Sequence, residues 1–257
     1  QLRRGTHFAM KTFSKQNAPK NFQEHLTLLS NANLLTTIDH PINKDSELHP
    51  LVRWQFQGGL KEQDRRAFLF NNVVDYEGRR YEIPVAVGAY AASPAIYAAG
   101  LGVRIEDIGD VWVRGMANPI KPELVKTGPC QEIVLLKEDL QRSGGGMATL
   151  PVPISTPGFD AAPYLTATLV ISKDPETGIQ NMGTYRGMLK SQDRLGVRMA
   201  ARLGGAGGYQ HWLKYKERNQ KMPVAIVVGC APAILFTGPQ KLPLNQDELA
   251  VAGGLIG

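Results

Sequence analysis

Apolar residues recur with the period of a helix in two places near the start of the chain. Phe22, Leu26 and Leu29 are four and three positions apart, so they fall on one face of a helix. Residues 48–57 carry a second amphipathic helical pattern, which stops at a pair of glycines. We therefore expect two helices that each turn one apolar face to a core.

Short strand-like runs lie between and after these helices. The predicted strands cover residues 34–42, 67–70 and 83–87. Ser93 followed by Pro94 is typical of a helix start, and Gly100 or Gly102 is expected to end that helix. This alternation of helix and strand predicts an α/β layer over roughly the first 120 residues.

Strand patterns and turn residues dominate the second half. Two stretches rich in glycine, proline and serine, 143–146 and 150–158, cannot be helical. The sequence Asp-Pro-Glu-Thr-Gly at 174–178 separates two strand-like runs and predicts a hairpin. The predicted strands cover residues 130–136, 164–172, 179–189, 194–200 and 223–228, and the predicted helices cover 209–218 and a segment that begins near Asp247. The expected fold class is α+β.

The composition is that of an ordinary globular protein. Of 257 residues, 43% are hydrophobic and 20% are charged, so the chain can bury a core without disulfides or a structural metal. The net charge is +6, but the first twenty residues hold five basic side chains and no acidic one. The remaining body is therefore close to neutral, and no nucleic-acid partner is expected. Residues 1–16 are expected to be an unstructured leader or an expression remnant.

The two cysteines and the hydropathy of the chain indicate the cellular compartment in which the protein is expected. Cys130 and Cys230 lie far apart and form no CxxC pair, which fits a reducing, cytoplasmic setting in which both thiols are buried and inert. An uncharged stretch over residues 83–103 is interrupted by Pro84 and Pro94, so we predict no membrane span.

An ordered series of motifs fills residues 150–257. It comprises Leu-Pro-x-Pro at 150–153, Asp-x-x-Pro-Tyr-Leu-Thr at 160–166, Asp-Pro-x-Thr-Gly-x-x-Asn-x-Gly-x-Tyr-Arg at 174–186, Arg198, Gly-Gly-Ala at 204–206, Tyr-Gln-x-Trp at 209–212, Met-Pro-Val-Ala at 222–225, and Glu248 before Ala-Gly-Gly at 252–254. In this order and spacing the series resembles the UbiD-like family of (de)carboxylases. These enzymes use prenylated flavin mononucleotide (prenyl-FMN), a divalent metal ion and a monovalent cation.

The resemblance implies a fold and a chemistry. It implies an N-terminal α/β domain at 17–125, followed by a flavin-binding split β-barrel at 126–257. It also implies a reversible decarboxylase or carboxylase that acts on an aromatic or α,β-unsaturated carboxylic acid and on CO₂. Prenyl-FMN, Mn²⁺ or Mg²⁺, and K⁺ are the implied cofactors, with the flavin as electron sink.

Asn181 and Glu248 are the candidate metal ligands. Their side chains offer the hard oxygen donors that Mg²⁺ and Mn²⁺ prefer. The resemblance puts both on the ion that grips the flavin phosphate. Taken alone, Asn181 is better explained as a turn residue at a strand end, and Glu248 as an acid favoured by the dipole in the first turn of a helix. The two together in the motif series favour the metal site.

Arg186 is the candidate catalytic residue. Five positions separate it from Asn181, so an ideal strand points the two side chains to opposite faces unless it bends at Gly183. The span of roughly 16 Å is comparable to a flavin from phosphate to ring. We therefore expect Arg186 at the ring end, with Thr184 and Tyr185 along the flavin. A guanidinium there can hold a substrate carboxylate by two hydrogen bonds. The alternative is a surface arginine.

Further flavin contacts follow from the resemblance alone. They are Arg198, Met199, Ala200, Leu203 and Gly204, in addition to Thr184, Tyr185 and Arg186. A guanidinium and a glycine-rich turn before a helix suit a phosphate, although such a turn is as often a simple loop. Arg202 falls where related sequences often have histidine, so the third protein ligand of the metal is left unassigned.

The resembled family places its proton-handling acids downstream of Glu248, and no acid in this sequence matches them. We therefore expect the chain to provide the cofactor platform, and to act as a homo-oligomer or with a complementary subunit or segment that supplies those acids. Two alternatives stay open. One is a non-catalytic flavin-binding subunit or assembly module. The other is a flavin reductase, which needs a nicotinamide site that the sequence does not reveal.

Overall fold

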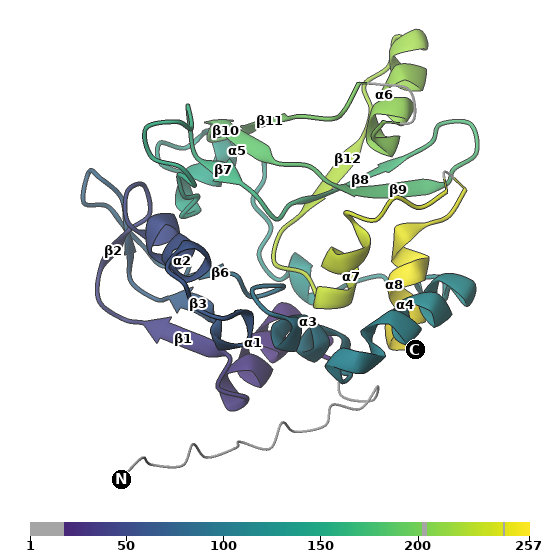
Figure 1. Cartoon of the computed structure of the whole chain (residues 1–257). Coiled ribbons are helices and arrows are strands. Elements are labelled where there is room, and N and C mark those ends of the chain that lie inside the picture. The colour runs from purple at the N-terminus through teal and green to yellow at the C-terminus, as the bar shows by residue number, and fades with distance from the viewer. Residues whose placement is uncertain (1–17, 202–204, 244) are drawn as a thin grey trace.

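The computed structural model describes residues 18–201, 205–243 and 245–257, which form a mixed α+β fold (Figure 1). The predicted leader and two predicted flavin contacts, Leu203 and Gly204, lie outside the described residues. The helices are α1 (Phe22–Asn31), α2 (Leu48–Gln57), α3 (Pro94–Leu101), α4 (Ile108–Ala117), α5 (Lys137–Gln141), α6 (Gly207–Glu217), α7 (Pro232–Thr237) and α8 (Glu248–Ile256).

Twelve strands are described, in four sheets of three strands each. They are β1 (Leu35–Ile38), β2 (Ile42–Asn43), β3 (Ala67–Phe70), β4 (Val73–Val74), β5 (Arg80–Tyr81), β6 (Val85–Val87), β7 (Tyr164–Leu165), β8 (Leu169–Lys173), β9 (Gln180–Thr184), β10 (Gly187–Ser191), β11 (Arg194–Val197) and β12 (Val224–Val227). The sheet orders are β1-β3-β6, β2-β4-β5, β12-β8-β9 and β11-β10-β7.

The N-terminal half packs helices on the sheet β1-β3-β6, in which β1 and β3 are parallel and β6 is antiparallel. Leu29 of α1 and Ile96 of α3 are fully buried in one cluster with Ala67 of β3. The predicted helix start after Ser93 is confirmed, because the Ser93 hydroxyl accepts the Ile96 N–H. The helix ends at Gly102, which adopts the left-handed conformation at φ 67°.

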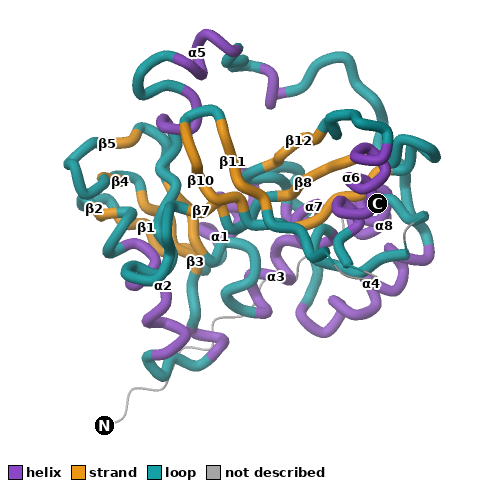
Figure 2. Tube along the Cα trace, turned by 90° about the horizontal axis from the view of Figure 1, so that it is seen from above, coloured by secondary structure: helices purple, strands orange, loops and turns teal. Residues whose placement is uncertain are grey.

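The strands of the two sheets in the second half are shorter than the sequence pattern predicted. The run predicted over 164–172 divides into β7 and β8, and the run over 179–189 divides into β9 and β10. The break after Thr184 lets the chain pass from the sheet β12-β8-β9 to the sheet β11-β10-β7. In both views the latter sheet lies between the N-terminal strands and β8 (Figures 1 and 2). Closure of these sheets into a split β-barrel stays a prediction.

Helices from both halves share one apolar cluster. Leu101 of α3 and Val111 of α4 are buried with Phe236 of α7 and Leu255 of α8. Figure 1 shows α7 and α8 beneath β8 and β9, next to α4. The approach of α3 to α7 is close, since a Cβ added at Gly100 would lie 2.8 Å from Pro232. Helices α7 and α8 are therefore packed against helices of the N-terminal half.

The structure corrects two predictions around residue 130. The strand predicted over 130–136 is absent, because this segment forms a 3₁₀ turn at Pro129–Gln131 and then runs without a pairing neighbour. Its apolar side chains are exposed, Ile133 at 78% and Leu136 at 64%. Cys130 is likewise exposed, not buried, while Cys230 is half-buried.

Smaller differences concern element ends and missed helices. The strand predicted over 34–42 is two strands, β1 and β2, since the chain turns at Pro41. Helix α4 was not predicted, although Ile108, Val111, Trp112 and Gly115 have helical spacing. Among the described residues, no helix is both long and apolar enough to cross a bilayer.

Candidate functional site

Asn181 and Glu248 meet where strand β9 lies against the start of helix α8. The Asn181 Nδ2 donates to Glu248 Oε1 at 2.8 Å, and the Met182 backbone N–H donates to Glu248 Oε2 at 2.8 Å. Two side chains that are 67 positions apart in sequence thus share one buried point. The structure brings the two predicted metal ligands together, while a metal ion between them stays a prediction.

Glu248 is buried, with 4% of its surface exposed, at the first position of α8. Asp247 caps this helix by accepting the Leu249 N–H at 2.8 Å. Burial raises the pKa of the Glu248 carboxyl, and the hydrogen bonds from Met182 and Asn181 offset only part of that effect. A divalent cation would favour the charged form of this carboxylate.

The Asn181 Oδ1 is buried and has no hydrogen-bond partner among the residues that the structure describes. Such an atom carries a desolvation cost that a ligand can relieve. Gly207, the first residue of α6, lies against the same amide, since a Cβ added there would be 2.5 Å from Oδ1. The sequence analysis missed Gly207, because one glycine in a glycine run carries no sign of what it approaches.

Thr184 and Tyr185 lie at the end of β9. Within the described part of the chain, the Thr184 Oγ1 is also buried without a hydrogen-bond partner. Thr184 lines a pocket of about 290 Å³ together with Tyr90, Tyr97, Phe236 and Gln240. The Tyr185 ring packs on Gly183, since a Cβ added there would come within 2.6 Å of ring atom Cε2. Burial raises the pKa of the Tyr185 hydroxyl. Thr184 thus presents a polar atom to this pocket, and the Tyr185 ring lies against the strand that carries Asn181.

Arg186 is exposed between β9 and β10, and its guanidinium carbon lies 5.6 Å from the centre of the Tyr164 ring. Contact with an aromatic face orients a guanidinium while leaving its N–H donors available. The backbone between Asn181 and Arg186 is not one continuous strand, because β9 ends at Thr184. The interruption therefore lies after Thr184 and not at Gly183, where the sequence analysis expected a bend, and the placement of the two residues along a ligand stays a prediction.

The remaining predicted contacts follow β11. Arg198 and Ala200 are exposed, and Met199 is half-buried with its thioether close to Gly208 and Tyr185. Arg202, at the position of the unassigned third ligand, lies outside the described residues. Within the described ranges, no group of three His, Cys, Asp or Glu side chains gathers around a point that could hold a metal. The donors available at the site are therefore Asn181 and Glu248.

Comparison with a protein-family model gives one match. Residues 123–257 match the UbiD model, described as the 3-octaprenyl-4-hydroxybenzoate carboxy-lyase Rift-related domain. The matched residues include Asn181, Arg186 and Glu248.

Solved structures extend the likeness over both halves of the chain. An evolved dimeric form of the UbiD-class enzyme HmfF from Pelotomaculum thermopropionicum, in complex with prFMN, is 25% identical with a TM-score of 0.78, over 92% of this chain and 50% of that one. The apo 3,4-dihydroxybenzoic acid decarboxylase from Enterobacter cloacae is 27% identical with a TM-score of 0.76, over 93% and 49%. Vanillic acid decarboxylase from Sedimentibacter hydroxybenzoicus, in closed form, matches in fold alone at 23% identity and a TM-score of 0.79, over 92% and 48%. The chain therefore spans about half the length of these relatives.

Proposed function

The chain belongs to the UbiD family, and we propose that it provides the cofactor-binding portion of a prenyl-FMN-dependent decarboxylase that also runs as a carboxylase. Residues 17–125 form an N-terminal α/β domain and residues 126–257 the flavin-binding domain in this proposal. The substrate is an aromatic or α,β-unsaturated carboxylic acid, and CO₂ is the other product. The catalytic unit is a homo-oligomer or includes a complementary subunit.

The meeting of Asn181 and Glu248 carries this proposal. A buried carboxylate and an unpaired amide oxygen are hard donors, which suit Mn²⁺ or Mg²⁺ next to a phosphate. A cation between the two side chains would give the Asn181 Oδ1 a partner and would favour the charged form of the buried Glu248 carboxylate. The family's flavin phosphate would supply further oxygen ligands from outside the chain, and K⁺ would bind as a separate second cation.

Arg186 supplies the second element. When bound, prenyl-FMN provides the electron sink for loss of CO₂. The exposed guanidinium of Arg186 can hold a substrate carboxylate by two parallel hydrogen bonds and keep it charged. Tyr164 fixes one face of the guanidinium, which limits the directions in which it can present its donors. Thr184 and Tyr185 line the flavin between Arg186 and the metal site, and Arg198, Met199, Ala200, Leu203 and Gly204 complete its surroundings.

A second candidate is a flavin-binding subunit that acts only with another polypeptide. The exposed apolar segment after α4 favours it, since Leu124 is 99% exposed and Ile133 78% exposed. Such a subunit would bind the flavin and metal but release no CO₂ by itself.

Mass spectrometry of the cofactor released from the purified chain tests the first proposal. The chain is produced together with a source of prenyl-FMN, and the mass of prenyl-FMN is expected. Plain FMN points instead to ordinary flavin binding, and no flavin refutes the proposal. An assay of CO₂ release from a panel of aromatic acids then separates the enzyme from the subunit: release by the chain alone contradicts the second candidate.

A further inference from the structure

Helix α6 presents one stripe of side chains to the β8–β9 hairpin. The stripe consists of Gly207, His211, Lys214 and Arg218, spaced by four, three and four positions, so all four lie on one face of the helix. His211 contacts Ser172, and Lys214 contacts Asp174. Gly207 lies against Asn181, one of the two candidate metal ligands. The stripe is therefore the surface by which α6 docks on the sheet.

The hairpin offers a matching row. Ser172 of β8 and Asn181 of β9 are direct cross-strand partners, so their side chains lie side by side on one face of the sheet. Asp174 follows two positions after Ser172 and continues this row. Gly207 lies on Asn181, and the His211 Nδ1 lies 2.9 Å from the Ser172 Oγ, with both of these side chains buried.

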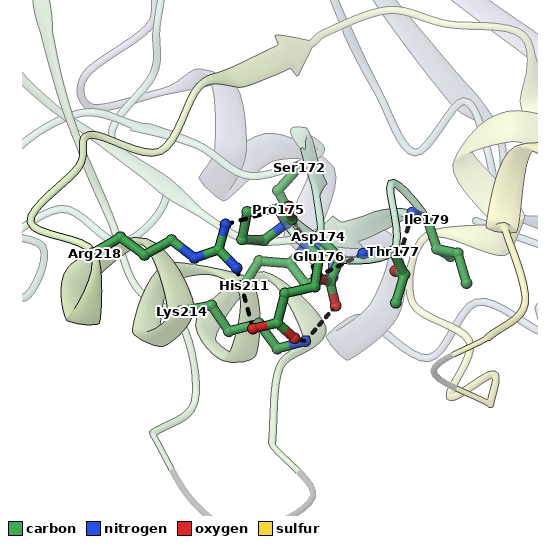
Figure 3. Close-up of polar contacts among 9 residues, drawn as sticks. All are labelled: Ser172, Asp174, Pro175, Glu176, Thr177, Ile179, His211, Lys214 and Arg218. Atoms are coloured by element: carbon green, nitrogen blue, oxygen red, sulfur yellow. Dashed lines mark hydrogen bonds and ion pairs between the residues drawn. The ribbon is translucent and has the colours of Figure 1, made fainter.

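Ion pairs close the far end of the contact (Figure 3). The Lys214 Nζ lies 2.6 Å from Asp174 Oδ2 and 2.8 Å from Glu176 Oε2, and the Arg218 Nη2 lies 3.2 Å from Glu176 Oε1. The Asp174 side chain is only 12% exposed, so this pair is partly shielded from water, unlike an ordinary surface pair. Burial by itself raises the pKa of Asp174, but Lys214 and the turn amides outweigh it and bring the pKa down to about 2.

Asp174 also shapes the hairpin turn. Its Oδ1 accepts the Glu176 N–H at 2.8 Å, and its backbone N–H donates to Ile179 at 2.9 Å. One carboxylate thus fixes the turn with one oxygen and the helix with the other. Lys214 therefore ties α6 to the hairpin turn about two helical turns away from Gly207.

We propose that Asp174, Lys214 and the Ser172–His211 contact are positioning residues for the Asn181–Glu248 site. They hold α6 in the register that keeps Gly207 against the Asn181 amide. That contact leaves Asn181 with its Nδ2 on Glu248 and its Oδ1 free for a cation. This inference rests on the proposed function, because it assigns a metal to Asn181.

Because α6 is a rigid helix that docks on the sheet, the Asp174–Lys214 ion pair can affect the position of Asn181 at the other end of the helix. A helix is stiff along its axis, and a shift of one position turns its contacting face by about 100°. If α6 lost its anchor, a shift that brought Ala206 to the place of Gly207 would put a Cβ against the Asn181 amide, whereas Gly208 on the other side has no Cβ. Asn181 would then lose its orientation toward Glu248. Outer contacts of this kind typically change metal affinity by about 10–100-fold.

Two variants of the full chain remove the ion pair. Lys214→Met deletes the cation and keeps most of the stem. Asp174→Asn keeps the oxygen that accepts the turn amides and removes the charge that pairs with Lys214, so it spares the hairpin. Lys214→Arg should retain function, because arginine reaches the same carboxylates. Lys216→Met is the matched control, since Lys216 lies on the same helix but over the Trp212 ring at 5.1 Å.

Mn²⁺ affinity is measured by electron paramagnetic resonance of the free ion, and FMN affinity by quenching of flavin fluorescence. Hydrogen exchange of the Met182 amide is followed in the metal-free protein. We expect Lys214→Met and Asp174→Asn to bind Mn²⁺ about 10-fold more weakly and to exchange Met182 faster, while Lys216→Met and Lys214→Arg match the wild type. Unchanged Mn²⁺ affinity in both ion-pair variants overturns the inference. If the wild type binds neither Mn²⁺ nor FMN, the proposed function fails. The inference is then judged by hydrogen exchange alone, and an unchanged exchange rate of the Met182 amide in both ion-pair variants overturns it.

Discussion

Gly207→Ala is the smallest change that tests the candidate metal site. The substitution adds one methyl group at the first residue of α6. The added Cβ would lie 2.5 Å from the Asn181 Oδ1, 2.6 Å from its Cγ and 2.8 Å from its Nδ2. All three distances are far below the ~3.5 Å of a normal contact between heavy atoms, so the amide must move by roughly 1 Å.

The size of the effect follows from what the amide holds. A shift of that order breaks the 2.8 Å hydrogen bond from Asn181 to the buried Glu248 carboxylate. Leaving a buried acceptor without its donor costs about 1–3 kcal/mol, whereas alanine gains at most about 1 kcal/mol over glycine in a helix. We expect a net loss of about 1–2 kcal/mol in the free energy of unfolding, which is a fall in Tm of about 2–8 °C for a chain of this size. Mn²⁺ affinity should fall by about 10–100-fold, since the amide oxygen moves with its nitrogen.

Thermal unfolding followed by circular dichroism and Mn²⁺ titration measure the two effects. Gly109→Ala is the matched control, because Gly109 also lies in the first turn of a helix, α4, and a Cβ there meets no atom within 4 Å. It should leave Mn²⁺ binding unchanged and raise stability by up to about 1 kcal/mol. If Gly207→Ala behaves like Gly109→Ala in both measurements, the close contact with Asn181 does not position a ligand and the reasoning is refuted.

Four further predictions concern the site and the surface. Arg186→Lys should abolish turnover in the complete enzyme while flavin still binds, because lysine loses the two-point grip on a carboxylate; wild-type turnover would contradict the role of Arg186. The pKa of Glu248 is raised above 4.5 by burial, so the metal-free protein should lose stability as pH rises through that pKa. Glu248→Gln should remove this slope from a plot of Tm against pH, and an unchanged slope argues against a buried carboxylate. Cys130 should react with a thiol reagent well before Cys230, whose pKa burial raises to about 11, and equal rates would contradict their placement. The exposed apolar segment after α4 should make the purified chain self-associate, which light scattering after size exclusion checks, and a stable monomer would oppose it.

Features set by neighbouring residues were predictable from the sequence. The cap at Ser93, the hairpin turn after Asp174 and the start of α8 after Asp247 each depend on residues within a few positions. The prediction of a strand over 130–136 was wrong because a short apolar run does not supply a pairing partner, and this segment has none among the described strands. The single long runs over 164–172 and 179–189 were likewise too long, since nothing local marks where a strand changes sheets.

The candidate site likewise has features that could be predicted from the sequence and features that depend on tertiary packing. The oxygen chemistry of Asn181 and Glu248 could be inferred from residue type, and their pairing was implied by the family resemblance, but neither gave the hydrogen bond between them. The contact of Gly207 with Asn181 was beyond reach, because it depends on how α6 docks on the sheet. In the sequence, Lys214 is one of several charged residues on a predicted helix. Its contact could not be predicted, because its partner, Asp174, lies 40 positions earlier.

The distance in sequence between Asn181 and Glu248 also sets an order of assembly. The 67 positions between them take about 3–13 s to translate at typical rates. During that interval the β8–β9 hairpin and α6 can already be joined by the contacts of Lys214 and His211, all of which lie earlier in the chain. The Met182 amide, however, has to wait for α8 before it finds its carboxylate acceptor. The part of the site made by β8, β9 and α6 can therefore form first, and the Glu248 carboxylate joins it only once α8 has docked.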